Sequence, residues 1–504
     1  MAHEIPETWT RHGLLLLCGA GLSMASPSNV PSWWEFNEKI LEGIKRRALD
    51  DISFSPEVSQ SIQELTLDRI DLLSFSQVIH DAFAGGTWFS LLPYLDGEQP
   101  NYSHWAVAAL AQAGIITTVL TTNFDTLLER AANELGVAFE ILVPGRHTPP
   151  DPSLTGLKIV KLHGGLGETA TLVDLATQKC RGFTDEWIQW IIRECESHSI
   201  LVAGFSGLDL DISADYIGLL AAASSIPSLT WLAREPGNLP VTARKVIAEC
   251  GQRATLTKGV LPDYLMQYID RTDFPEAKVA QKRTQIEDWL KARHVDPLSC
   301  AAAVGRLLLN VGDVEISSSL RRELRQFITD SMRKGVDMIA ALSCGLALHQ
   351  MGTDSMTCRD FENAARDLKL SAALQRKVIE DLDGANLSVS QRAVQERREN
   401  FSGTLANLGM VLTYLGWEED AKVAADEAEK LVESIPENFT KEHRMGTLRV
   451  VRALLALGND HTELSIIHYT AAAAHFRTAG DHTEAKNVEM NLERLTMRGN
   501  QSGK

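Results

Sequence analysis

Four short polar or glycine-rich stretches could carry chemistry, and each directly follows a run of apolar residues. They are GAGLS at 19–23, TNFD at 122–125, HGG at 163–165 and GFSGLD at 204–209. A glycine-rich turn after a strand lets backbone N–H groups and a helix N-terminus face an anion. Gly19 and Gly21 permit close approach of a ligand, and Ser23 can donate to a phosphate oxygen. The first stretch therefore suits the pyrophosphate of a dinucleotide.

Each of these residues also has a purely structural explanation, and the sequence leaves it open. GAG after a strand is often only a tight turn, and Met24 replaces the third glycine of the usual dinucleotide fingerprint. Ser23 could be a helix cap. Asn123 and Asp125 could shape the start of a helix, because the TLLE segment that follows is a plausible capping box. His163, which precedes two glycines, could be a turn histidine.

The sequence predicts no metal site. Asp209, Asp211 and Asp215 are close in sequence, but no histidine or glutamate accompanies them, so we expect helix capping or contact with an adenosine. The seven cysteines are scattered and include no C-x-x-C pair. Neither a zinc ribbon nor a disulfide framework can be read from that spacing.

The elements that must position these stretches form an α/β pattern in the first half of the chain. Short, nearly all-apolar runs predict strands that are covered on both faces, at 14–18, 115–121, 158–162, 200–203 and 229–232. Amphipathic stretches such as 34–46 and 126–135 lie between them. This alternation predicts a Rossmann-like parallel sheet wrapped by helices, with ligands bound at the carboxyl ends of the strands.

The second half has a helical pattern, from about residue 285 to residue 494. The segment 405–438 fits the helical repeat of about 34 residues, with Gly416 at the turn and Ala421 and Ala428 at close helix contacts. A generic helical bundle is the alternative. We predict two domains, an α/β domain at 1–275 and an all-α, tetratricopeptide-like sensor or assembly domain at 276–504.

Composition excludes some functions. The 504-residue chain has a formal charge of −17, with 66 acidic against 49 basic residues, so strong nucleic-acid binding is not expected. No apolar run is long enough for a membrane helix, and the first residues do not form a secretory signal. We therefore expect a cytoplasmic protein that is not bound to a membrane.

Taken together, the four stretches resemble the sirtuin-like family of NAD-consuming domains. GAG-x-S, TNFD in place of Gln-Asn-Ile-Asp, LHG, and GFS in place of Gly-Thr-Ser occur in family order over roughly residues 10–235. The resemblance implies NAD as substrate, a base at His163, and Asn123 and Asp125 at the nicotinamide ribose and carboxamide. Cleavage of the nicotinamide bond needs a held ribose and a base of near-neutral pKa. The resemblance assigns NAD binding to Gly19, Ala20, Gly21, Ser23, Thr122, Gly204, Ser206 and Asp209.

The chain departs from the deacylating sirtuins, because only Cys180 and Cys195 lie between His163 and Gly204 and a four-cysteine zinc module cannot form. It is more similar to sirtuin-like domains of bacterial antiphage defence proteins, which carry a PSW segment after the loop, as here at 31–33. That resemblance implies an NAD+ glycohydrolase used in abortive infection and held in check by a homo-oligomer or a second defence protein. An NAD or ADP-ribose sensor without turnover, and a deacylase or ADP-ribosyltransferase, remain the alternatives.

Overall fold

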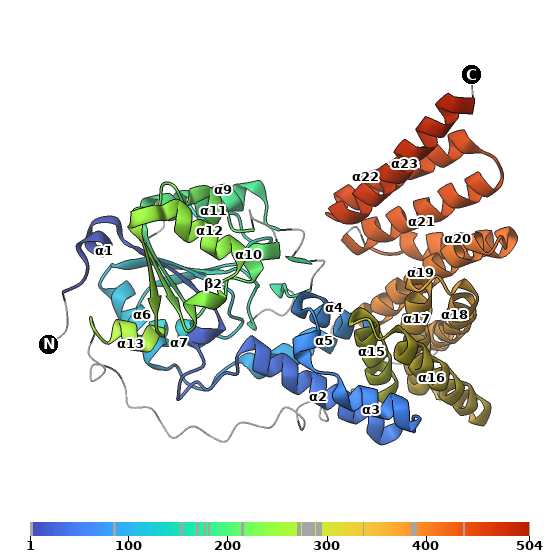
Figure 1. The fold of residues 1–504 in the computed structure, drawn as a ribbon, viewed down its shortest axis with the longest axis horizontal. Coiled ribbons are helices and arrows are strands. Elements are labelled where there is room, and N and C mark those ends of the chain that lie inside the picture. Colours follow the sequence, from blue (N-terminus) through green and yellow to red (C-terminus); the bar gives the residue numbers. More distant parts are fainter. Residues whose placement is uncertain are drawn as a thin grey trace. The chain divides into compact units, whose positions relative to one another are not determined.

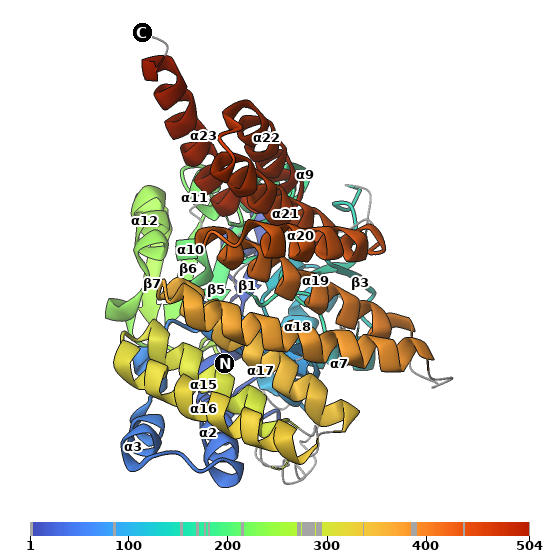
Figure 2. The ribbon, with the colours of Figure 1, turned by 90° about the vertical axis from the view of Figure 1, so that its right-hand side faces the viewer.

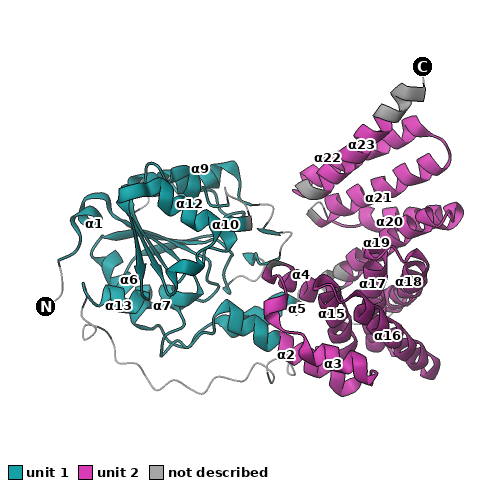
Figure 3. Ribbon diagram, viewed as in Figure 1, with its two compact units in different colours: residues 1–40, 88–290 teal, residues 41–87, 291–504 magenta. Residues whose placement is uncertain are grey.

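The structure, a computed structural model, divides the chain into two compact units. Unit 1 comprises residues 1–40 and 88–290, and unit 2 comprises residues 41–87 and 291–504 (Figure 3). The described residues are 4–83, 87–151, 155–167, 171–175, 178–179, 182–212, 216–269, 274, 288, 295–335, 337–384, 391–436 and 439–502.

The chain passes from unit 1 into unit 2 within helix α2 (Trp33–Asp51) and returns at α5 (Thr87–Leu91). The segment 41–87 thus packs with the helical unit. The sequence predicts that it is part of the first domain. The predicted boundary between residues 275 and 276 lies outside the described residues.

Unit 1 contains a seven-stranded parallel sheet with the strand order β3-β4-β2-β1-β5-β6-β7 (Figure 1). The predicted Rossmann-like α/β fold is therefore confirmed. The five predicted strands are all present, with ends that differ from the prediction by no more than about one residue. The two edge strands, β3 and β7, were not predicted. The strands are β1 (Leu14–Cys18), β2 (Ile116–Thr121), β3 (Phe139–Leu142), β4 (Leu157–Lys161), β5 (Ser199–Ala203), β6 (Leu229–Ala233) and β7 (Ala254–Lys258).

Helices cover both faces of this sheet (Figure 1). Helices α9 (Asp185–Ser197), α11 (Leu219–Ala222) and α12 (Val241–Cys250) pack on one face. The other face is covered by α6 (Tyr102–Gln112), α7 (Leu127–Glu134) and α13 (Leu261–Leu265). Helices α1 (Glu7–His12) and α10 (Asp209–Ile212) also belong to this unit.

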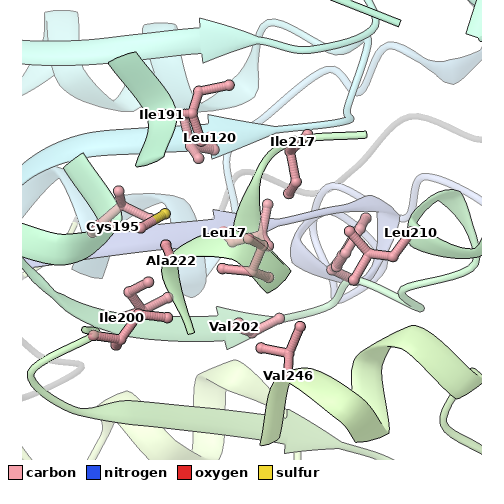
Figure 4. Packing of buried hydrophobic residues seen from close by; sticks show 14 of the residues in the cluster. Leu17, Leu120, Ile191, Cys195, Ile200, Val202, Leu210, Ile217, Ala222 and Val246 are labelled. Carbon is pink, nitrogen blue, oxygen red and sulfur yellow. The ribbon is translucent and has the colours of Figure 1, made fainter. Parts of the chain in front are cut away.

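The continuous apolar run of β1 follows from its place in the centre of the sheet. Side chains alternate along a strand, so Leu15 and Leu17 face one helical layer while Leu14 and Leu16 face the other. All of these side chains are at most 1% exposed. Figure 4 shows Leu17 packed among side chains of neighbouring strands and of the helices on its face.

The register brings the functional loops to one edge of the sheet. Cys18, the last residue of β1, pairs with Thr121 of β2 and with Ala203 of β5, and Thr121 pairs with Lys161 of β4. These four strands therefore end level with one another, directly before the four stretches that the sequence singles out. Strands β2 and β5 lie on opposite sides of β1 in the sheet. The strand order therefore reverses here, and this edge is a topological switch point.

Unit 2 is all-helical in its described residues, and Figure 2 shows α15 to α23 stacked in chain order. Gly416 (φ +74°) forms the turn between α19 and α20, as predicted. A Cβ on Gly409 would lie 3.4 Å from the Ala421 carbonyl oxygen, so small residues let these two helices approach closely. No helix among the described residues could cross a membrane. The helices are α3 (Pro56–Glu64), α4 (Leu72–Ala82), α15 (Pro297–Asn310), α16 (Val314–Lys334), α17 (Met338–Thr357), α18 (Phe361–Gly384), α19 (Gln391–Tyr414), α20 (Glu418–Glu433), α21 (Phe439–Gly458), α22 (Thr462–Thr478) and α23 (His482–Ser502).

Candidate active site

A buried hydrogen-bond network joins the loops that follow β1 and β2. Ser23 is 0% exposed, and its hydroxyl donates to Asp125 Oδ2 at 2.7 Å. The same Oγ accepts from Asn123 Nδ2 at 3.1 Å and lies 3.1 Å from His104 Nε2. His104 Nδ1 accepts a hydrogen bond from the Asn101 backbone N–H, so the proton of the neutral ring is on Nε2 and Ser23 Oγ accepts it. The hydroxyl of Ser23 is thus fully used inside the protein and holds Asn123 and Asp125 in place.

Burial sets the charge states in this network. It lowers the pKa of His104 to about 3, so that ring is neutral at pH 7. Burial also raises the pKa of Asp125, and the ammonium of Lys161 opposes that rise. Lys161 Nζ donates to the Asp125 main-chain oxygen and pairs with Glu129 at 2.8 Å. A buried cation therefore lies directly beneath the TNFD loop.

The capping box that the sequence made plausible at the start of α7 does not form. The Thr126 hydroxyl donates to Asp96, and Glu129 pairs with Lys161. Asp125 takes the capping role instead, because its Oδ1 accepts from the Leu127 N–H at 3.1 Å. The carboxylate of Asp125 thus both starts α7 and orders the network around Ser23.

The bare backbone of the first loop packs against the loop after β5. A Cβ on Gly21 would lie 2.5 Å from Gly204 Cα, and one on Gly19 would lie 2.9 Å from the Gly204 oxygen. Gly204 itself has φ +64°, and a Cβ there would lie 2.7 Å from the Leu22 nitrogen. No side chain larger than hydrogen fits where the two loops cross. Contact between the two loops alone therefore explains why glycine is required at these three positions.

The first loop also differs from the usual dinucleotide-binding turn. The N–H of Gly21 donates to Gly204 O, that of Leu22 to Gly19 O, and that of Ser23 to Ala20 O, so these three groups are used within the protein. The loop forms a short 3₁₀ turn, and the next α-helix begins only at Trp33. The helix N-terminus expected to follow the glycines directly is absent from this loop.

His163 lies in a second buried network, built from the loops after β4 and β5. Its Nε2 is 2.8 Å from the Tyr216 hydroxyl and 3.9 Å from Asp209 Oδ2. Lys179 pairs with Asp209 at 3.5 Å and with Asp174 at 3.1 Å. Burial lowers the pKa of His163 to about 4, although the carboxylate of Asp209 favours the charged ring. At pH 7 the imidazole is therefore neutral and able to accept a proton, but burial holds its pKa below the near-neutral value expected of the base.

The effect of burial on the pKa of Asp209 is outweighed by its charged neighbours. Burial works against its ionisation, but His163 and Lys179 together lower its pKa below the ordinary value of 3.8. It is therefore a carboxylate at neutral pH. An anion at this distance would stabilise a protonated His163, since opposite charges within a few ångströms favour the charged form.

Phe124 connects the two networks. Its ring centre lies 6.2 Å from that of His163 and 6.0 Å from that of Trp33, and Trp33 in turn packs edge-on against Trp88. Trp33 thus packs the first loop against buried aromatic rings, whereas the neighbouring Trp34 is 42% exposed.

The predicted site residues lie together at one edge of the sheet, and they differ in how far they are exposed to solvent. Asn123, Asp125 and His163 are each at most 7% exposed. Gly19 and Ser23 are buried with them, and Asp209 is partly exposed. The other predicted NAD-binding positions reach the surface to some degree, and they are Ala20, Gly21, Thr122, Gly204 and Ser206.

Several residues of the site were not predicted. Tyr216 and His104 are remote in sequence from His163 and Ser23, the residues they contact, and Lys179 is remote from Asp209. Nothing in their immediate surroundings marks them. Arg234 could have been found, because it directly follows the buried strand β6 as the other site residues follow theirs. Its guanidinium lies 3.4 Å from Met24 Sδ and so places a positive charge beside the first loop.

The other predicted acidic residues have structural roles where they are described. Asp211 accepts from the N–H groups of Val241 and Thr242 and so caps α12, which confirms the capping interpretation. Asp215 and Cys180 lie outside the described residues. Within the described part of the chain, no three His, Cys, Asp or Glu side chains are grouped as a metal site.

Part of the chain that forms this site is similar to a known protein family. Residues 117–253 match the SIR2-like domain family. The match covers three of the four stretches and begins after the glycine-rich loop. No curated protein matches the chain significantly. The SIR2-like domain gives unit 1 a sirtuin-like, NAD-related character.

The residues present fit NAD at its nicotinamide end. A neutral imidazole, a carboxylate and an ordered amide lie at the switch point of the sheet, where nucleotides bind in such folds. At the diphosphate end the partly exposed loop backbone and Arg234 are the groups that would hold the ligand, because the Ser23 hydroxyl is occupied by Asp125.

Proposed function

We propose that the SIR2-like domain hydrolyses NAD+ to ADP-ribose and nicotinamide. The observation that carries this proposal is the pairing of His163 with Asp209. A buried, neutral imidazole has a carboxylate 3.9 Å from its Nε2, at the sheet edge where nucleotides bind. A base with a stabilising carboxylate is the arrangement that general base catalysis requires.

The reaction breaks the C–N bond between nicotinamide and the ribose, forms a C–O bond to water, and releases one proton. His163 accepts this proton on its unprotonated ring nitrogen, and Asp209 stabilises the resulting imidazolium. Burial keeps the pKa of Tyr216 well above its ordinary value, so its hydroxyl stays protonated. A hydrogen bond of 2.8 Å between Tyr216 Oη and His163 Nε2 keeps the imidazole in one orientation.

The loops around β1 and β2 supply the rest of the site. Ser23 holds the amide of Asn123 in a single orientation, and the network beneath it leaves little freedom to the TNFD loop. We propose that Asn123 and Asp125 fix the nicotinamide ribose and its carboxamide, while Ala20, Gly21 and Gly204 face the diphosphate.

Hydrolysis fits this chain better than deacylation. The segment between β4 and β5 is short and contains Cys180 and Cys195 as its only cysteines. Cys195 lies on the buried face of α9, in the hydrophobic core, where burial raises the pKa of its thiol. A thiol in that position is unsuited to a zinc ligand set.

We further propose that the protein is a cytoplasmic effector of antiphage defence, whose helical unit senses a trigger or drives assembly. This follows the resemblance of the PSW segment and the compact region after His163 to defence-associated sirtuin-like domains. A free NAD hydrolase would be toxic to its own cell. Control by oligomerisation or by a second protein is therefore expected.

The test uses the full chain in water enriched in ¹⁸O, with NAD and its products followed by ¹H NMR and the label in the products measured by mass spectrometry. Hydrolysis predicts equal amounts of nicotinamide and ADP-ribose, with one ¹⁸O per ADP-ribose. Asn123→Ala should abolish the reaction, and Asn133→Ala, on the exposed side of α7, should not. A cyclic product without label, transfer to protein, or binding with full recovery of intact NAD would each overturn the assignment.

A further inference from the structure

A small cavity in unit 2 is lined by four arginines. It has a volume of about 220 Å³ and lies between α16, the end of α17 and the first turns of α18. In a chain with a formal charge of −17, a cluster of this kind is unexpected unless it has a specific role. The cavity is lined by Ser318, Arg321, Arg322, Arg325, Ser355, Asp360, Asn363 and Arg366.

The positive charge of this cavity is only partly balanced. Arg325 is neutralised by Asp367, with bonds of 2.5 and 2.6 Å to the two carboxylate oxygens. Among the described residues, no ion pair is found for Arg321, Arg322 or Arg366. These three guanidinium groups share one carboxylate in the lining, and the buried carboxylates of Asp354 and Asp367 behind it offset part of their charge.

That carboxylate is itself engaged in starting α18. Asp360 accepts from the Asn363 side-chain amide at 2.8 Å and from its backbone N–H at 3.4 Å. The cavity thus lies at the N-terminal turns of a long helix, where the helix dipole also favours an anion. Excess arginine charge and the helix terminus act in the same direction.

Arg321 gives the strongest evidence that the cavity binds an anion. Its side chain is 4% exposed, and Nη1 has no hydrogen-bond partner within the described part of the protein. Its Nη2 makes only a long contact, 3.8 Å, with the sulfur of Cys358. A buried guanidinium without an acceptor is strongly unfavourable, and a ligand oxygen in the cavity would supply one.

We propose that this cavity binds the phosphate or diphosphate group of a small soluble molecule. Arginine forks match the geometry of phosphate oxygens and bind them in pairs. Pockets that enclose a whole drug-sized ligand have volumes of roughly 300 to 1,000 Å³, so this cavity takes the phosphate group and leaves the remainder outside. Arg322 and Arg366 are exposed at its rim and close over the anion, while Arg321 forms its floor.

The test is isothermal titration of the full-length protein with inorganic pyrophosphate and, separately, inorganic phosphate, at constant ionic strength. The double variant Arg322→Gln/Arg366→Gln removes two exposed side chains and should fold normally. We expect it to bind at least about tenfold more weakly than the wild type. Arg333→Gln is the matched control, because Arg333 is an exposed arginine of the same helix that pairs with Asp330. It should bind within about twofold of the wild type.

Saturable binding of either probe that is lost in the double variant and kept in Arg333→Gln supports the site. Pyrophosphate binding much tighter than phosphate identifies a diphosphate group, and similar affinities identify a single phosphate. The proposal is overturned if neither probe binds the wild type saturably. It is also overturned if the double variant binds as well as the wild type, since the anion would then be bound elsewhere, for example in unit 1.

Discussion

Substitution of Gly204 by alanine tests the explanation of the glycine-rich loops. Gly204 has φ +64°, and a Cβ there would lie 2.7 Å from the Leu22 nitrogen and 2.8 Å from the Gly21 carbonyl carbon. Both neighbours are backbone atoms, so they cannot turn aside as a flexible side chain would. The two loops would have to separate at the point where the predicted nucleotide site lies.

The magnitude follows from two separate costs. Left-handed backbone costs an L-residue about 1–2 kcal/mol, and overpacking in a tight region costs about 1–3 kcal/mol. Gly204→Ala should therefore lower the free energy of unfolding of unit 1 by about 2–5 kcal/mol. Gly136→Ala is the matched control, because Gly136 has φ +68° and nothing within 4 Å of its Cβ position. Only the first cost, about 1–2 kcal/mol, applies there.

Urea denaturation followed by tryptophan fluorescence measures this difference. Of the ten tryptophans, Trp417 alone lies outside the residue ranges of unit 1, so the signal reports almost entirely on that unit. The account predicts that Gly204→Ala is the more destabilising variant by about 1–3 kcal/mol. Equal destabilisation by the two substitutions would refute the claim that contact between the loops requires glycine.

Three further predictions concern the buried networks. Ser23→Ala leaves three buried polar groups without their partner and should cost about 3 kcal/mol in urea unfolding. Ser103→Ala should be nearly neutral, because that buried hydroxyl has no partner among the described residues. Burial lowers the pKa of His163 from 6.5 to about 4, so the folded state binds fewer protons than the unfolded state between these values. Stability of unit 1 should therefore fall as the pH drops through this range, by up to about 1.4 kcal/mol per pH unit, and His163→Gln should reduce that slope in urea titrations. Asp209→Asn should slow NAD turnover by about 10²-fold. Asp211→Asn should instead keep turnover and cost about 1 kcal/mol of stability, since it only caps α12.

The central part of the sheet could be predicted from the sequence for a physical reason. Strands such as β1 are covered by helices on both faces, so every residue is apolar and the run is easy to recognise. The edge strands β3 and β7 are partly exposed and mix polar with apolar residues, so they lack this signal. The segment 41–87 was also not assigned to the helical unit, because its amphipathic helices look alike whichever unit they pack against.

Individual residues of the candidate site could be predicted from the sequence, but their contact partners could not. His163 and Asn123 were found because unusual residues directly after buried strands must meet at one edge of a parallel sheet. Their partners Tyr216 and His104 are placed by tertiary contacts across long stretches of sequence, which no local pattern reveals. Gly19 and Gly21 were singled out for ligand binding, whereas their contact with Gly204 depends on the strand order, which the sequence alone does not give.

The most direct test of the central claim is a paired measurement on His163→Ala. NAD binding is measured by calorimetry and NAD turnover by nicotinamide release, with the wild-type protein as reference. If the imidazole of His163 is the base, the variant should bind NAD within a few-fold of the wild type and hydrolyse it about 10²- to 10⁴-fold more slowly. Turnover at the wild-type rate would contradict the account.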